Sequence, residues 1–156
     1  MGPLGIVLLN LGGPDSPEAV EPFLRNLFSD PEVIQLGWAS FLQGTLAKMI
    51  ARRRAPLSRE AYAQIGGRSP IRAESEAQAA AVAEALGRAG VTARPYVAMA
   101  CWHPFSEEAI AAMRAYGVQN AVAVPLYPHH SRTTTVSSFN LLERAAAGSG
   151  IALAKV

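Results

Sequence analysis

The chain has 156 residues, of which half are hydrophobic and 17% are charged, and its formal net charge is +2. This balance excludes a disordered chain, and the length suits a single domain over residues 1–156 that buries one core. No apolar run reaches ~18 residues, so no membrane-spanning helix is expected. Met1–Ile6 lacks the basic start and cleavage site of a signal peptide, and the single cysteine, Cys101, allows no internal disulfide. We therefore expect a cytoplasmic protein.

The charges are distributed unevenly along the chain. Residues 1–35 carry five acidic side chains against Arg25 alone, a net −4, and residues 36–72 carry seven basic side chains against Glu60 alone, a net +6. A basic segment can meet nucleic acid, anionic lipid or a ligand with carboxylates. Nucleic acid is not expected as a partner, because no recognised motif or interleaved aromatic residues accompany the arginines.

The beginning of the chain predicts a strand followed by a helix. Residues 4–11 form an apolar run closed by Gly12–Pro14, which is typical of a strand buried on both faces of a parallel sheet. Ser16 then provides an N-cap for a helix over 17–28.

Residues 38–54 predict a second helix, which Pro56 should end, and Tyr62 then falls on a short helix after Ser58. Its C-terminal end carries the basic cluster Arg52–Arg54, either a solvated helix end or a contact for an anion or a membrane. The apolar stripe of this helix includes Trp38, Phe41, Leu42 and Met49. By default such a stripe packs in a core, and the alternative is a hydrophobic lip for a ligand.

The rest of the chain alternates helices and strands. The expected helices cover 70–88, 106–116 and 134–147, and the expected strands cover 91–101, 119–126 and 151–156. Strands that alternate with helices in this way form a parallel sheet with right-handed crossovers. The sequence therefore predicts an α/β fold, a parallel sheet flanked by helices in a flavodoxin-like layer arrangement.

Three of the expected strands end in loops that carry glycine, proline, histidine or hydroxyl groups. These loops are Gly12–Pro14, Cys101–Pro104 and Tyr127–Thr135. The carboxyl ends of parallel strands meet at one edge of the sheet, where such sheets bind ligands. The sequence contains neither G-x-G-x-x-G nor a P-loop, so no motif supports nucleotide binding.

Histidines and hydroxyls in the last loop are candidate ligand contacts. His129 and His130 are neighbours, so in an extended loop their side chains point apart and do not easily share one metal ion. A solvated role and contact with a ligand or a metal both stay open for them. Ser131–Ser138 offers six hydroxyls at the start of a helix, which suits either ordinary capping or an anion.

Five motifs in this order resemble the ferrochelatase family, whose members insert iron into a porphyrin. The motifs are Leu9–Pro14, Arg52–Pro56, Tyr62–Pro70, Trp102–Phe105 and Pro125–Ser138. Two short matches, Pro22–Leu24 and Phe28–Asp30, lie in register between the first two motifs. The resemblance covers almost the whole chain and implies a chelatase-like layer fold.

The sequence departs from the family pattern at three places. Arg68 stands where the motif G-G-G-S-P has its third glycine, and Ala100-Cys101 replaces a usual Arg-Tyr pair. His129-His130 replaces a usual Gln-Tyr or Gln-Phe pair.

The resemblance implies protoporphyrin IX and Fe²⁺ as substrates, with no cofactor in this chain. Protoporphyrin is a flat, apolar macrocycle with two propionates, for which guanidinium and hydroxyl groups are suitable donors. The residues that match the family's propionate side are Arg54, Tyr62 and Ser69. Leu11 matches a position that faces the ring, and an apolar residue there resembles the enzymes that use protoporphyrin rather than coproporphyrin. The remaining porphyrin-binding candidates are Tyr127, Ser131 and Thr134.

The family's metal-handling His and Glu are expected beyond Val156, so no catalytic residue is assigned in this chain, and His129 and His130 are weak metal candidates. The resemblance therefore implies the N-terminal half of a two-domain ferrochelatase, whose partner is a C-terminal domain. The alternative is a non-catalytic module that binds porphyrin or heme. A half-size homodimeric chelatase is disfavoured, because no paired histidine motif is present. A peripheral membrane contact through Trp38, Phe41, Leu42 and Arg52–Arg54 stays open.

Overall fold

The computed structural model describes residues 3–156, which form two compact units. The first, here called the sheet unit, holds the chain up to Leu11 and from Ala73 to Val156. The second, here called the helical unit, spans Gly12–Arg72. The single domain expected over residues 1–156 stays a prediction.

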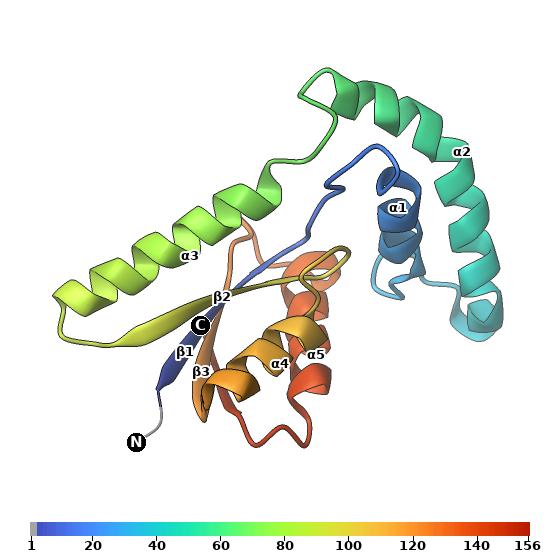
Figure 1. Ribbon diagram of the computed structural model, residues 1–156. Coiled ribbons are helices and arrows are strands. Elements are labelled where there is room, and N and C mark those ends of the chain that lie inside the picture. The colour runs from blue at the N-terminus through green and yellow to red at the C-terminus, as the bar shows by residue number, and fades with distance from the viewer. Residues whose placement is uncertain (1–2) are drawn as a thin grey trace. The chain divides into compact units, whose positions relative to one another are not determined.

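The sheet unit contains a four-stranded parallel sheet in the order β2-β1-β3-β4 (Figure 1). Its strands are β1 (Leu4–Asn10), β2 (Ala93–Met99), β3 (Asn120–Pro125) and β4 (Ala152–Lys155). The order corresponds to the flavodoxin-like arrangement. The expected α/β class and the parallel sheet are therefore confirmed, and all four predicted strands are present.

Helices cover both faces of this sheet. They are α3 (Ile71–Arg88), α4 (Ser106–Tyr116) and α5 (Ser137–Ala146). Ile6 and Leu8 of β1 pack with Ala79 of α3 in one apolar cluster, whereas Val7 and Leu9 belong to a second cluster. The helical members of that second cluster include Ile110 and Met113 of α4 and Leu142 of α5. Successive side chains of a strand point to opposite faces, so an uninterrupted apolar run supplies both clusters at once.

The helical unit is built on a pair of packed helices, α1 (Val20–Ser29) and α2 (Gln43–Ala63), with the 3₁₀ helix η1 (Gly37–Leu42) before α2. The buried side chains of α1 are Val20, Phe23 and Leu24, and those of α2 are Ala47, Ala51 and Ala55. Alanines four residues apart form one narrow stripe, which lets the two helices approach closely.

The expected helix end at Pro56 is wrong, because α2 continues through Pro56 to Ala63. Proline removes one backbone N–H and crowds the preceding turn, which often ends a helix. Here Pro56 is exposed, so the carbonyl that loses its partner can bond water, and the buried stripe of α2 is not interrupted. Tyr62 therefore lies in the last turn of α2 rather than on a separate short helix.

Helices form where the sequence predicts them, but the predicted starting residues are less accurate. Ser16 does accept the Ala19 N–H at 3.2 Å, but it caps a turn, and α1 begins only at Val20. The helix expected from residue 134 begins earlier, as the π-helix η2 (Arg132–Val136) that leads into α5. Across residues 3–156 no helix combines the length and the apolar character needed to cross a membrane.

The two-sided core predicts a large difference between two leucines in helices. Leu142 is 1% exposed in α5, and Leu57 is 73% exposed in α2. We expect Leu142→Ala to lower the free energy of unfolding by about 3 kcal/mol, because it leaves a cavity, and Leu57→Ala to change it by less than about 0.5 kcal/mol. Urea denaturation followed by circular dichroism measures both. Equal losses would contradict the placement of the core.

Candidate functional site

The carboxyl end of β1 lies between the loops that follow β2 and β3. The Ala100 and Cys101 N–H groups each donate at 2.9 Å, to the carbonyls of Asn10 and Leu11 respectively, and the Leu126 N–H donates to the Leu9 carbonyl at 2.8 Å. α3, which precedes β2, covers one face of the sheet, and α4 and α5, which follow β2 and β3, cover the other. This is a topological switch point, the place where parallel sheets bind ligands.

Asn10 fixes the exit of β1 at this edge. Its Oδ1 accepts the Leu11 N–H at 2.9 Å, and its Nδ2 donates to Oγ of the buried Ser75 at 3.1 Å. The sequence analysis gave neither residue a role, although Asn10 lies within the motif Leu9–Pro14. The available signal was that Asn10 is the one polar side chain within the apolar run 4–11.

The loop after β3 holds its hydroxyls in pairs. Ser131 Oγ lies 2.6 Å from Thr134 Oγ1, and Tyr127 Oη lies 2.8 Å from Ser138 Oγ. Ser131 is the N-cap of η2, yet its side chain makes no capping bond to a backbone N–H. Ordinary capping is therefore not its role here. A π-helix is uncommon and often marks a functional site, which supports the hydroxyl-rich segment η2 as a candidate ligand contact.

Histidines at this edge differ in their surroundings. His103 Nδ1 lies 2.7 Å from Glu108 Oε2, which also accepts the Phe105 N–H at 2.6 Å. His129 and His130 are exposed. Within residues 3–156 no group of three or more His, Cys, Asp or Glu side chains is arranged to hold a metal ion.

In the helical unit, two glycine-containing loops pack directly against each other. The Ser69 N–H donates to the Pro14 carbonyl at 2.7 Å. A Cβ on Gly13 would lie 2.5 Å from both Cβ and Oγ of Ser69, which is too close for any side chain. The first and third sequence motifs therefore meet here, and Gly13 sets where Ser69 lies.

Tyr62, in the last turn of α2, and Ser69, in the loop that follows, are both able to donate a hydrogen bond. The Tyr62 carbonyl accepts the Gly67 N–H at 2.8 Å, and the positive φ of 79° at Gly67 allows the turn. Burial raises the pKa of the Tyr62 phenol above its usual value, so the hydroxyl stays protonated at neutral pH. Ser69 Oγ accepts the Ile71 N–H at 3.3 Å, which leaves its own proton to donate.

Some of the basic side chains of α2 make contacts within the helical unit. Arg52 Nε lies 3.5 Å from Glu21 Oε1, and the Arg59 Nε donates to the Pro17 carbonyl at 3.0 Å. The exposed guanidinium carbon of Arg54 lies 5.9 Å from the centre of the Phe28 ring. Arg54 thus keeps its donors available for a carboxylate.

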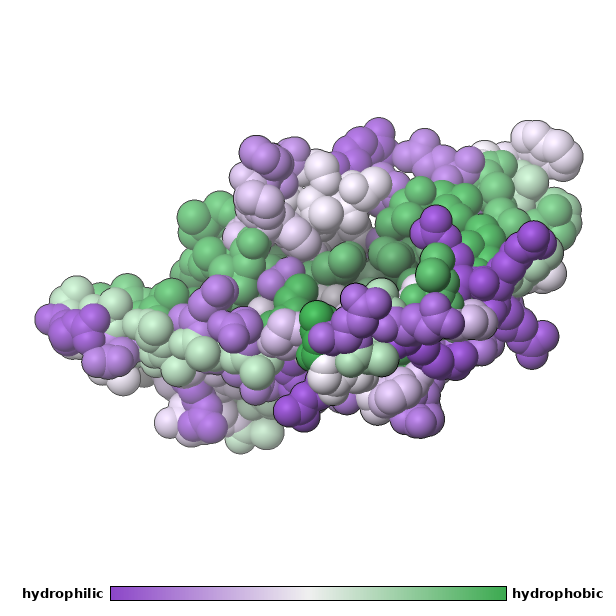
Figure 2. Space-filling model, turned by 90° about the horizontal axis from the view of Figure 1, so that it is seen from above, coloured by the Kyte–Doolittle hydropathy of each residue, from purple (hydrophilic) through white to green (hydrophobic). Residues whose placement is uncertain are grey.

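The expectation that the apolar stripe of 38–54 packs in a core is wrong for its bulkiest members. Trp38 is 90% exposed, Phe41 75% and Met49 60%, and Leu42 is exposed as well. Buried alanines fill the contact between α2 and α1, which leaves these larger side chains outside it. On the face seen in Figure 2, apolar surface (green) lies among hydrophilic surface (purple) over this part of the chain.

The structure therefore places the candidate residues in two groups. Leu11, half-buried, belongs to the sheet unit together with Tyr127, Ser131 and Thr134. Arg54, Tyr62 and Ser69 belong to the helical unit. Their contact with a porphyrin stays a prediction.

The close approach at Gly13 makes a test of this local geometry. Gly13→Ala should lower the free energy of unfolding by about 2 kcal/mol, because the new methyl group forces Ser69 away from Pro14. Hydrogen exchange of the Ser69 amide should become faster. As a control, Gly44→Ala meets nothing within 4 Å on α2 and should raise stability by about 0.5–1 kcal/mol. A neutral Gly13→Ala would contradict the contact.

Comparison with known proteins gives one family. The ferrochelatase family model matches residues 3–155. Ferrochelatases of Nostoc sp., Thermosynechococcus vestitus and Geotalea uraniireducens are 54%, 53% and 51% identical over 92%, 89% and 93% of this chain. The chain spans only 37%, 36% and 44% of their respective lengths. The family model over residues 3–155 and these relatives show that the chain belongs to the ferrochelatase family.

Proposed function

We propose that this chain is the porphyrin-binding part of a ferrochelatase that inserts Fe²⁺ into protoporphyrin IX to form heme. The observation that carries the proposal is the pairing of exposed, bulky apolar side chains with arginine, tyrosine and serine donors in the helical unit. A flat apolar ring with two propionates needs both kinds of surface. The metal-handling residues and the C-terminal domain that supplies them belong to the rest of the enzyme.

Each group of residues has a separate task in this proposal. Trp38, Phe41 and Met49 provide apolar area for the ring, and burying that area drives binding. Arg54, Tyr62 and Ser69 donate to the propionates, with the guanidinium able to make two parallel bonds to one carboxylate. In the sheet unit, Leu11 matches the position that faces the ring in the family, and the hydroxyls of Tyr127, Ser131 and Thr134 line the loop beside the switch point.

Metallation also requires two pyrrole protons to leave while the metal enters, and a side-chain base near the ring makes this faster. We assign no such base in this chain. We expect the chain by itself to bind porphyrin without inserting metal.

Porphyrin binding is tested by titrating the purified chain with protoporphyrin and following quenching of its tryptophan fluorescence. Saturable binding is expected, and Arg54→Ala should weaken it about tenfold because one charge-assisted contact is lost. With Zn²⁺ added, the absorption spectrum should show no metalloporphyrin.

Arg114→Ala is the matched control, since Arg114 is an exposed arginine on α4 of the sheet unit and should leave binding unchanged. If the Arg54 and Arg114 variants bind protoporphyrin with equal affinity, Arg54 is not part of the binding site. Zinc insertion at a rate near that of a complete ferrochelatase would overturn the expectation of inactivity, and the absence of binding would leave this chain without a porphyrin site of its own.

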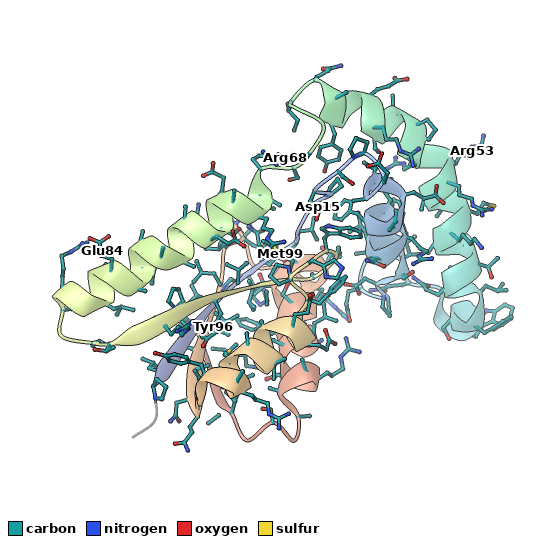
Figure 3. The ribbon with its side chains drawn as sticks, viewed as in Figure 1. Asp15, Arg53, Arg68, Glu84, Tyr96 and Met99 are labelled. Atoms are coloured by element: carbon teal, nitrogen blue, oxygen red, sulfur yellow. The ribbon has the colours of Figure 1, made fainter. Side chains whose placement is uncertain are left out.

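We further propose that the exposed surface formed by η1 and α2 binds to an anionic membrane. Thr45, Lys48, Met49, Arg52 and Arg53 line an open depression of about 520 Å³ on α2, and Arg53 projects from this helix in Figure 3. Trp38 and Phe41 are exposed on η1, directly before α2. Aromatic and basic side chains of this kind suit a headgroup region, and porphyrin is poorly soluble in water.

Sedimentation with lipid vesicles tests this contact in the absence of porphyrin. Vesicles of phosphatidylglycerol mixed with phosphatidylcholine should bind the chain, and pure phosphatidylcholine should bind it weakly. Arg53→Glu should reduce binding to the mixed vesicles about thirtyfold, because a basic residue near an anionic surface contributes about 1 kcal/mol and a charge reversal therefore changes the binding free energy by about 2 kcal/mol. Arg114→Glu should have a smaller effect. If both reversals act equally, net charge rather than this surface explains the binding.

A further inference from the structure

A charged hollow in the helical unit has no role in porphyrin binding as proposed above. It has a volume of about 270 Å³ and lies where α1 and α2 pack side by side (Figure 1). The contact through the alanine stripe of α2 holds the lining side chains around one space. These are the buried Ala51 and the residues Glu18, Glu21, Pro22, Arg25, Lys48 and Arg59.

The Glu21 carboxylate of this hollow is already paired. Arg52 Nε lies 3.5 Å from Glu21 Oε1, and Arg59 Nη2 lies 4.0 Å from Glu21 Oε2. The Arg59 side chain is also held in place, because its Nε donates to the Pro17 carbonyl at 3.0 Å. An anion that enters the hollow therefore meets an oriented guanidinium group and a carboxylate whose charge two arginines share.

Two further cations of the hollow are unpaired. Arg25 of α1 and Lys48 of α2 are exposed, and neither makes a hydrogen bond or an ion pair with another residue of 3–156. Glu18, which is also exposed, has no such partner within the same residues. With Arg52 included, four cationic side chains surround the hollow against two carboxylates, which leaves a surplus of two positive charges.

A small phosphate monoester matches this arrangement better than a carboxylate or a phosphodiester. A monoester carries about −1.5 to −2 charges at neutral pH and has three terminal oxygens, so it accepts hydrogen bonds from several sides. A carboxylate has one charge and two coplanar oxygens, which suit a single guanidinium group. Here the donors come from two helices, and they combine the forked groups of Arg25 and Arg59 with the point charge of Lys48.

We infer that the hollow between α1 and α2 is a binding site for a phosphate monoester, held by Arg25, Lys48 and Arg59. Such a group is present in soluble phosphate compounds and in the headgroup of phosphatidic acid. Lys48 also lines the depression that we propose to contact a membrane, so a lipid at that surface would be within reach of this site. The inference does not depend on porphyrin binding.

Titration with inorganic phosphate tests the site, with the chemical shift of the Ala51 amide followed by NMR at constant ionic strength so that screening stays fixed. We expect a saturable shift. Arg25→Ala and Lys48→Ala should each weaken binding about fivefold, because each removes one solvent-exposed charged contact. Glu18→Gln should strengthen binding, since it removes a carboxylate that repels the anion. Arg114→Ala, on α4 of the sheet unit, is the matched control and should leave the affinity unchanged.

Vesicle binding identifies the source of the phosphate. Vesicles of phosphatidic acid and of phosphatidylglycerol, each mixed with phosphatidylcholine, are compared at equal surface charge. If the ligand is a lipid, phosphatidic acid should bind the chain more tightly, and Arg25→Ala should abolish this preference. Arg53→Glu should instead weaken binding to both lipids by the same factor. If phosphate saturates the site but the two lipids bind equally, the ligand is a soluble phosphate.

A shift that does not saturate, together with equal binding of the two lipids, would overturn the inference. Equal phosphate affinities of Arg25→Ala and Arg114→Ala would also overturn it, because the effect would then come from net charge. Neither result affects the porphyrin titration, which depends on Arg54, and failure of that titration would leave this site in place. Circular dichroism of each variant checks folding, which these exposed side chains should not affect.

Discussion

The burial of β1 on both faces is the constraint on which the rest of this structure depends. Its alternate side chains enter two apolar clusters, and its backbone pairs with β2 and β3. α3 covers one face of the sheet, and α4 and α5 cover the other. At the exit of β1 the chain therefore continues toward one face, whereas the loops after β2 and β3 lead to the other. The loops that follow β2 and β3 lie at this exit, where parallel sheets bind ligands.

Backbone hydrogen bonds, rather than side-chain packing, position the candidate donors. The Ser69 N–H donates to the Pro14 carbonyl, and the Tyr62 carbonyl accepts the Gly67 N–H. This arrangement keeps the functional atoms in place without consuming the protons that Tyr62 and Ser69 could give to a ligand. It also explains why Gly13 matters although it carries no functional group, since any larger residue would displace Ser69.

The sequence indicated the fold well because a buried parallel strand is a continuous apolar run, as in residues 4–11, and alternation with helices leaves few topologies. Two expectations failed because they depend on neighbours that local sequence does not reveal. Proline inside a helix removes one hydrogen bond and crowds the preceding turn, but Pro56 is exposed, so solvent can replace the bond that is lost. The periodicity of residues 38–54 assumes one helix, but α2 begins only at Gln43 and its alanines fill the contact with α1. Trp38 and Phe41 lie on the preceding 3₁₀ helix η1 and are exposed. Family resemblance supplied the candidate contacts, whereas the bond from Asn10 to Ser75 joins residues far apart in sequence and required the structure.

The continuity of α2 through Pro56 fixes the separation of two candidate ligand contacts. Arg54 and Tyr62 lie eight residues apart on this one helix, and a rise of 1.5 Å per residue separates them by about 12 Å along its axis. Two short helices joined at Pro56 would have let the guanidinium and the phenol move independently. A single helix instead fixes the distance between the backbones of Arg54 and Tyr62. The polar groups of a ligand that contacts both side chains must match this spacing.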